Sequence, residues 1–285
     1  MSDSDKQAAT GTPSPSSEGR PTARASGGST AGSATDDGGR GLLERHPWLG
    51  YVLPLAVFML VTSFEPKPPA ANEPAEPGPW TVAYRYYPIV YTIKLAATLA
   101  AMAFVARTYR QFPWRVSPLA AVVGIAGAAV WIGLSSLGLE KRVLETLGLG
   151  SMVDLGQRSG FNPLAQMRDN PALAYAFLGV RFLGLAVVVP IIEEFFLRGF
   201  LMRFFVRPDW WNVPFGTVNT TALLVGTLVP VLMHPAEMLA AAVWFSAVTW
   251  LMLRTRNIWD CVVAHALTNL LLGVYVVGTG EWQLL

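Results

Sequence analysis

The sequence has only one cysteine, Cys261, which excludes an internal disulfide framework. Charged residues make up 14% of its 285 residues, whereas a typical soluble domain has about 25%. The net charge of +2 is small, and no basic cluster interleaved with aromatic residues indicates nucleic-acid binding. The sequence also lacks the HExxH motif of zinc peptidases and any repeat at solenoid spacing. These absences exclude a disulfide-rich scaffold and a solenoid, and they argue against a highly charged soluble protein.

Apolar residues dominate what remains. Hydrophobic residues make up 52% of the chain, although the first forty residues are polar. The apolar excess is therefore concentrated after that segment. Ten Trp and eight Tyr suit a protein with aromatic belts at the membrane interfaces. The composition indicates a protein that crosses a membrane several times.

Seven apolar segments predict an all-α, polytopic transmembrane helical bundle. A spanning helix needs about 20 apolar residues, and most of the segments are long enough. Seven spans are expected, or eight if the longest segment is divided or the loop at 139–172 dips into the membrane. Pro235 either separates two spans or kinks one. The segments are 48–64, 86–106, 118–138, 173–205, 216–234, 236–253 and 258–279.

The polar N-terminal segment, residues 1–40, is predicted to be a disordered cytoplasmic tail. It consists mainly of Ser, Gly, Ala, Thr and Pro, so it cannot bury enough surface to offset its conformational entropy. It has no short apolar core with a small-residue cleavage site, as a signal peptide would. The transmembrane helical domain is expected to cover residues 41–285.

The distribution of Arg among the loops predicts the orientation of the chain, because cytoplasmic loops are enriched in Lys and Arg. With seven spans, three Arg-containing loops lie on the same side as the N-terminal segment, which is therefore expected to be cytoplasmic. The opposite loop EPKPPAANEPAEPGPW is rich in proline and mildly acidic. The loop at 139–172 carries charges of both signs. The Arg residues on the predicted cytoplasmic side are Arg40, Arg45, Arg107, Arg110, Arg115, Arg203, Arg207, Arg254 and Arg256.

The run VVVPIIEEFFLRGFLMRFF places ionisable residues in one of the most apolar parts of the chain. Charges in hydrocarbon are costly, so such residues are functional candidates. On a helix, Glu194 and Arg198 lie four residues apart and can form an ion pair. Glu193 lies about 100° around the helix from Glu194 and is the less well paired carboxylate, which suits a general base. Pro190, one turn earlier, removes a backbone hydrogen bond and can open room for water.

Later apolar segments carry three more polar candidates. His234 ends an apolar segment in LVPVLMHPAE. His265 and Asn269, in CVVAHALTNLLLGVY, are four residues apart and project from one face of the last span. They could donate hydrogen bonds to an oxyanion. Together with the Glu pair, these residues supply a base, a partner acid or base, and hydrogen-bond donors, which are the groups needed for water to attack a carbonyl group.

Other interpretations of these residues stay open. The ion pair and the Asn can link helices structurally, and buried charges also line the ion paths of transporters. Two His and two Glu could bind zinc, although they are dispersed along the chain. Cys261 lies one turn before His265, so a cysteine peptidase is a further alternative. A serine peptidase is not supported, because Ser135 in GLSSLG has no obvious partner.

The motifs resemble those of the type II CAAX prenyl endopeptidases and their bacterial relatives, the CAAX-protease and bacteriocin-processing (CPBP) family. EEFFLR corresponds to the EExxxR motif of that family, and HALTN corresponds to its last motif, HxxxN. His234 falls where the middle motif, FxxxH, supplies a histidine, although Pro230 replaces the Phe. The resemblance covers residues 173–279. The whole chain is similar to the CAAX-protease-related branch found with bacterial exosortase sorting systems.

The resemblance implies an intramembrane glutamate endopeptidase that needs no metal or other cofactor and has a cavity open to the cytoplasm. By this resemblance, Glu193 and His234 would activate a water molecule. His265 and Asn269 would stabilise the tetrahedral oxyanion. Glu194 and Arg198 would hold Glu193 in place. The substrate would be a membrane-associated or lipidated protein or peptide.

The expected location is a bacterial inner membrane, with several spans and a cytoplasmic N-terminus. The expected partners are the lipid bilayer and a membrane-embedded or lipidated substrate, with no nucleic acid. The alternative from another class is a non-catalytic membrane factor that acts in immunity, as a chaperone or as a sorting partner. A Glu193→Gln change separates the two classes, because it should abolish peptidase activity, whereas a pure binding role can survive it.

Overall fold

The computed structural model describes residues 41–68, 82–148 and 160–284. These residues are mostly helical and contain no β-strand in those ranges. Five helical runs are long and apolar enough to cross a membrane, namely Tyr84–Phe104, Pro118–Val143, Pro171–Val206, Pro235–Thr255 and Ile258–Thr279. Two shorter apolar helices, Leu49–Thr62 and Thr220–Met233, complete the set. The all-α membrane bundle predicted from the sequence is confirmed, and the predicted tail lies outside the described residues.

Each of the seven apolar segments contains one main helix or helical run. The first three hold α2 (Leu49–Thr62), α3 (Tyr87–Phe104) after the 3-10 turn η1 (Tyr84–Tyr86), and α5 (Pro118–Leu137). The segment at 173–205 is not divided. It forms one run from α8 (Pro171–Leu183) through the π-helical η2 (Gly184–Val188), α9 (Val189–Glu194) and the π-helical η3 (Phe195–Leu201) to α10 (Met202–Val206).

The last three helices are α11 (Thr220–Met233), α12 (Met238–Thr255) and α13 (Ile258–Thr279). His234 and the 3-10 turn η5 (Pro235–Glu237) separate α11 from α12, so Pro235 ends one helix rather than kinking it. The short elements are α1 (Leu42–Arg45), α4 (Ala106–Tyr109), α6 (Leu139–Thr146), α7 (Pro163–Gln166), η4 (Trp210–Asn212) and η6 (Trp282–Leu284).

Asparagine residues start the helices that carry the polar candidates. Asn170 accepts a hydrogen bond from the Leu173 amide at 3.1 Å, and Pro171 occupies the first position of α8. Asn219 accepts from the Ala222 amide at 2.8 Å and starts α11. Asn257 does the same for α13, where it accepts from the Trp259 amide at 3.1 Å. Because these caps satisfy amides that would otherwise lack a partner, they fix where each helix begins.

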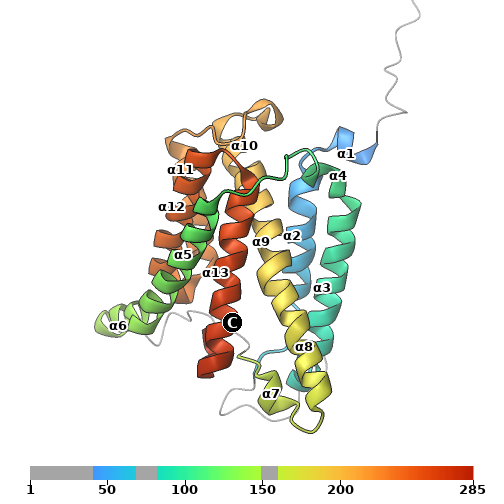
Figure 1. Ribbon diagram of the computed structural model, residues 1–285, viewed down its shortest axis with the longest axis vertical. Helices are drawn as coiled ribbons and strands as arrows, with labels where there is room; N and C mark the ends of the chain where they lie inside the picture. The colour runs from blue at the N-terminus through green and yellow to red at the C-terminus, as the bar shows by residue number, and fades with distance from the viewer. Residues whose placement is uncertain (1–40, 69–81, 149–159, 285) are drawn as a thin grey trace, which may run out of the picture. The chain divides into compact units, whose positions relative to one another are not determined.

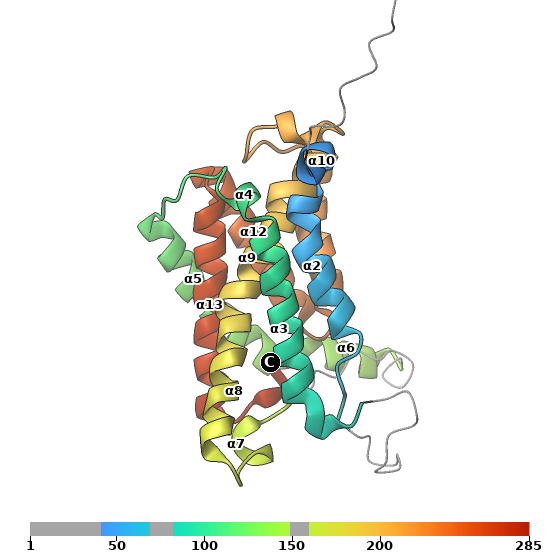
Figure 2. The ribbon, with the colours of Figure 1, turned by 90° about the vertical axis from the view of Figure 1, so that its right-hand side faces the viewer.

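Figure 1 shows the arrangement of the helices within residues 41–284. The elements α1, α4 and α10 lie at one end of the bundle, and α6 and α7 lie at the other. In both views α3 lies beside α2, and α13 lies between α5 and the α8–α9 run (Figures 1 and 2). Three Arg-containing loops, at 105–117, 207–219 and 256–257, lie at the α1 end, which we call the arginine-rich end.

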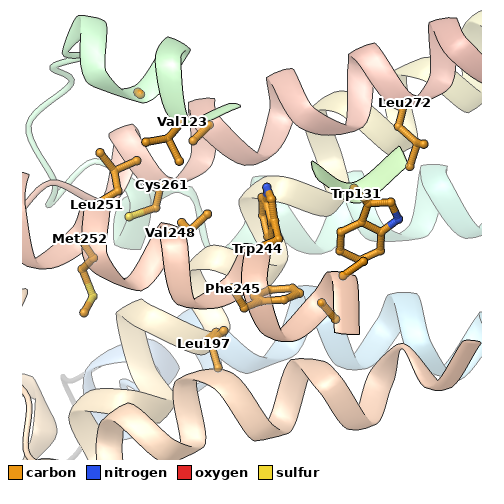
Figure 3. Close-up of a cluster of buried hydrophobic side chains, with 14 of the residues drawn as sticks. Val123, Trp131, Leu197, Trp244, Phe245, Val248, Leu251, Met252, Cys261 and Leu272 are labelled. Carbon is orange, nitrogen blue, oxygen red and sulfur yellow. The ribbon is translucent and has the colours of Figure 1, made fainter. Parts of the chain in front are cut away.

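Two glycines allow α5 to approach its neighbours closely. A Cβ atom on Gly124 would lie 2.8 Å from the Ala264 carbonyl oxygen of α13. A Cβ atom on Gly127 would overlap the indole of Trp244. The cluster of buried apolar side chains around Trp244, shown in Figure 3, joins α5, α12 and α13 into the wall behind the site. These glycines therefore pack helices within one chain.

Candidate active site

Four of the six predicted site residues line one cavity of about 670 Å³. They come from three helical segments, since α9 supplies Glu193, the end of α11 supplies His234, and α13 supplies His265 and Asn269. The remaining two, Glu194 and Arg198, are completely buried and do not line the cavity. The structure therefore brings together residues that lie up to 76 positions apart in the sequence, from 193 to 269.

The ion pair between Glu194 and Arg198 forms as the four-residue spacing predicts. Both side chains have no exposed surface. Arg198 also donates hydrogen bonds to the Phe245 carbonyl at 3.1 Å and to the Thr249 hydroxyl at 3.4 Å. The pair therefore ties the Glu-bearing run to α12, and the additional acceptors help to offset the cost of burying a charged group.

His265 connects this ion pair to the cavity. Its Nδ1 lies 3.0 Å from Glu194 Oε1, and its ring makes an edge contact with Trp244 at 4.6 Å between ring centroids. Since Glu194 is also paired with Arg198, it accepts the hydrogen bond and Nδ1 carries the proton. This contact fixes the orientation of the ring, so that Nε2 faces Glu193.

Glu193 is the more accessible of the two carboxylates. Its side chain is 18% exposed, whereas that of Glu194 is fully buried. Glu193 Oε2 lies 3.9 Å from His265 Nε2, which is too long for a direct hydrogen bond. Polar groups at such a distance are commonly bridged by water. The π-helical segments η2 and η3 flank α9 and alter the helical register around Glu193.

His234 is held by the end of its own helix. Its backbone amide bonds to Val231 rather than to Pro230, which leaves the Pro230 carbonyl available. His234 Nδ1 donates to that carbonyl at 2.8 Å. The contact places the proton on Nδ1 and the lone pair on Nε2. The ring also packs against Trp131 and Phe245, at 5.5 and 5.7 Å between centroids.

Asn269 binds the π-helical turn that precedes α9. Its Nδ2 donates to the Leu185 carbonyl at 3.0 Å, which occupies one of its two amide hydrogens. The preceding residue of α13 makes a second polar link, in which the Trp244 indole donates to Thr268 at 3.0 Å and Thr268 donates to the Gly124 carbonyl at 2.8 Å. Asn269 therefore positions the Glu-bearing run and keeps one hydrogen available for a ligand.

The cavity extends away from the arginine-rich end. Its wall includes the last residues of α2 and the chain that follows, the first half of α3, and the turn after α11. Met59 of α2 and Leu232 of α11, which both line the cavity, are 45% and 77% exposed. In a bilayer such apolar side chains face lipid, so the cavity has an apolar lateral border as well as a polar end.

Four charged wall residues were not singled out from the sequence. Lys94 and Arg181 are buried in apolar segments, and Glu65 and Lys67 follow α2. Lys94 Nζ and Glu65 form an ion pair. The criterion that selected Glu193, a charge inside an apolar run, also applies to Lys94 and Arg181. Their isolation from any recognisable motif is the reason that the sequence alone did not single them out.

The alternative chemistries gain no support from the geometry. Cys261 is fully buried within the apolar cluster of Figure 3 and does not line the cavity. Within the described ranges, no group of three His, Cys, Asp or Glu side chains is arranged to hold a metal ion. Ser135 likewise does not line the cavity.

The fold and the site define an all-α membrane bundle with a buried glutamate, histidine and asparagine constellation. Residues 175–271 match the family described as type II CAAX prenyl endopeptidase Rce1-like. That segment contains all six predicted site residues. Over this segment, which is about a third of the chain, the protein is similar to that family. No curated protein and no solved structure matches the chain.

Proposed function

We propose that the protein is an intramembrane endopeptidase that uses Glu193 as its base and cleaves a peptide bond in a membrane-associated or lipidated substrate. The observation that carries the proposal is the convergence of Glu193, His234, His265 and Asn269 on one cavity, with the Glu194–Arg198 pair behind it. A purely structural Glu194–Arg198 ion pair would not need four further polar groups on a cavity wall.

The proposed reaction begins with a water in the space between Glu193 and the two histidines. Glu193 takes a proton from the water while the water oxygen attacks the carbonyl carbon of the substrate. His234 accepts a hydrogen bond from the same water through Nε2. Asn269 and the doubly protonated form of His265, through Nε2–H, donate to the oxyanion of the tetrahedral intermediate. Glu193 then returns the proton to the leaving nitrogen as the C–N bond breaks.

Comparative terminal proteomics tests this proposal. Membranes of cells that carry the wild type are compared with membranes that carry Glu193→Gln at matched abundance. Glu145→Gln, at an exposed glutamate of α6, is the matched control. We expect specific termini to disappear only in Glu193→Gln, with accumulation of the uncut precursors. If the wild type and Glu193→Gln give the same terminal profiles while full deletion of the protein still has a phenotype, the result would instead support a non-catalytic membrane factor.

We further propose that the substrate enters from the non-cytoplasmic side or laterally from the bilayer of a bacterial inner membrane. Short cytoplasmic loops are enriched in Lys and Arg, so the arginine-rich end is assigned to the cytoplasm. The cavity wall is made from the opposite halves of the helices. This differs from the cytoplasmic opening that the family resemblance implies, and it suits a protein that has already been exported.

Single-cysteine labelling tests the orientation. In a Cys261→Ala background, Lys67→Cys reports on the cavity end and Arg110→Cys reports on the arginine-rich end. A membrane-impermeant maleimide added to intact spheroplasts should label Lys67→Cys only, and both sites should react after lysis. Labelling of Arg110→Cys alone in intact spheroplasts would contradict the assignment.

A further inference from the structure

Arg181, on α8, is a buried cation on the wall of the cavity. Arg181 is only 6% exposed and lines the cavity that contains Glu193. Nη1 donates to the Phe161 carbonyl at 2.7 Å, and the rings of Tyr87 and Trp282 lie 5.9 and 5.8 Å from the guanidinium carbon. In the described part of the chain, no carboxylate pairs with Arg181. A buried charge of this kind is normally paired.

The two other buried arginines of the same helical run are better satisfied. Arg198 pairs with Glu194 and donates to two further oxygens. Arg203 donates to three backbone carbonyls, those of Gly199, Trp211 and Val213. Arg181 has one such acceptor and has five donor hydrogens. Of these three arginines, only Arg181 lines the cavity that contains Glu193.

Neighbouring groups do not supply the missing anion. Glu65, the carboxylate that lines the cavity in addition to Glu193, pairs with Lys94 at 2.5 Å. The two aromatic rings lie close to the limit of about 6 Å for a cation–π interaction, so their attraction is weak. One neutral carbonyl and two distant rings do not offset the removal of a guanidinium group from water. The wall therefore carries an excess positive charge at Arg181.

We propose that Arg181 binds the C-terminal carboxylate of the peptide that occupies the cavity. The proposal rests on the proposed peptidase function, which places a peptide there, and it makes Arg181 a substrate-binding residue rather than a catalytic one. The planar guanidinium group matches a carboxylate with two parallel hydrogen bonds. An α-carboxylate is also the one anion that every peptide C-terminus provides.

The separation of Arg181 from Glu193 indicates the length of the bound tail. The two residues are twelve positions apart on one helical run, which corresponds to about 18 Å along its axis. An extended peptide covers about 3.4 Å per residue, so about five residues span this separation. Cleavage about five residues before a C-terminus is therefore expected.

Affinity selection with mass spectrometry tests the carboxylate site without requiring turnover. The probe is an apolar hexapeptide library with free C-terminal carboxylates, together with the same library amidated at the C-terminus. Both are offered to the full-length Glu193→Gln protein in nanodiscs. We expect about tenfold or greater preferential retention of the acids, as a charge-assisted bidentate contact provides. Arg181→Gln should remove the preference, and Arg181→Lys should retain part of it.

Arg85→Gln is the matched control, because Arg85 is an exposed cation of η1 that does not line the cavity. It should keep the preference for acids, and all variants should show the same thermal unfolding. Equal retention of acids and amides by the Glu193→Gln protein overturns the proposal, and so does an unchanged preference in folded Arg181→Gln. Equal retention of acids and amides is also the result expected if a lipid anion, rather than a peptide carboxylate, binds Arg181. Because retention does not depend on hydrolysis, failure of the peptidase function would appear separately, in the comparison of termini.

Discussion

Replacing Glu194 with Gln should destabilise the bundle more than replacing any exposed glutamate. The substitution preserves shape but removes the negative charge beside Arg198. Arg198 would then keep only neutral acceptors, the Phe245 carbonyl at 3.1 Å and the Thr249 hydroxyl at 3.4 Å. The guanidinium group has no exposed surface through which water could replace the lost partner.

The expected loss in the free energy of unfolding is about 3–5 kcal/mol, the usual cost of leaving one member of a buried pair without its partner. Arg198→Met should cost less, because Glu194 keeps its contact with His265 Nδ1 at 3.0 Å. The double variant, which combines Glu194→Gln with Arg198→Met, has no buried arginine that lacks its carboxylate partner. It should therefore recover at least about 2 kcal/mol relative to Glu194→Gln.

Reversible chemical unfolding in detergent micelles measures these differences, and cleavage of an identified substrate measures function. Stability should recover in the double variant while cleavage stays absent, because His265 loses the carboxylate that orients its ring. A loss below about 1 kcal/mol in Glu194→Gln would refute the reasoning. It would mean that the two neutral acceptors are sufficient for Arg198.

Two further predictions concern packing and charge outside the catalytic groups. Gly127→Ala should lower the free energy of unfolding by about 1–3 kcal/mol, because the added methyl group meets the Trp244 indole, whereas Gly133→Ala has nothing within 4 Å and should be neutral or slightly stabilising. The hydrogen bond from Arg207 lowers the pKa of Asp209 to about 2. The stabilisation that this pair provides is complete above the unfolded pKa of about 3.9 and is lost as pH falls towards 2. The difference in Tm between the wild type and Asp209→Asn should therefore be the same at pH 6 and pH 8.

The sequence was sufficient to predict the seven apolar helices, because hydropathy alone identifies segments that must satisfy their backbone internally. The boundaries were close, and α13 begins and ends at the predicted residues, 258 and 279. The depth of His234 within the membrane-crossing bundle was harder to predict from the sequence. Asn219 starts α11 later than the apolar run does, so His234 follows a helix of only 14 residues and lies inside the bundle.

The pairing of Glu194 with Arg198 followed from helix geometry, but the link from Glu194 to His265 did not. That contact joins residues 71 positions apart and depends on how α9 packs against α13. The contact between Asn269 and the Leu185 carbonyl was equally invisible, because it depends on the π-helical turn η2. Local spacing thus predicts contacts within a helix, whereas contacts between helices require the packed structure.

Pro230 is the one departure from the motif pattern of the family, and its effect can be predicted from the structure. His234 is oriented by the backbone carbonyl of residue 230, which any residue supplies. Pro230→Ala restores an amide that can bond to the preceding turn and keeps the carbonyl. Cleavage should therefore stay within about threefold of the wild type, which is less than one kcal/mol, whereas His234→Ala should abolish it. Quantitative terminal proteomics on both variants provides the measurement. If Pro230→Ala is as inactive as His234→Ala while its abundance and thermal unfolding are unchanged, the proline ring itself orients the histidine, and the carbonyl contact is not sufficient.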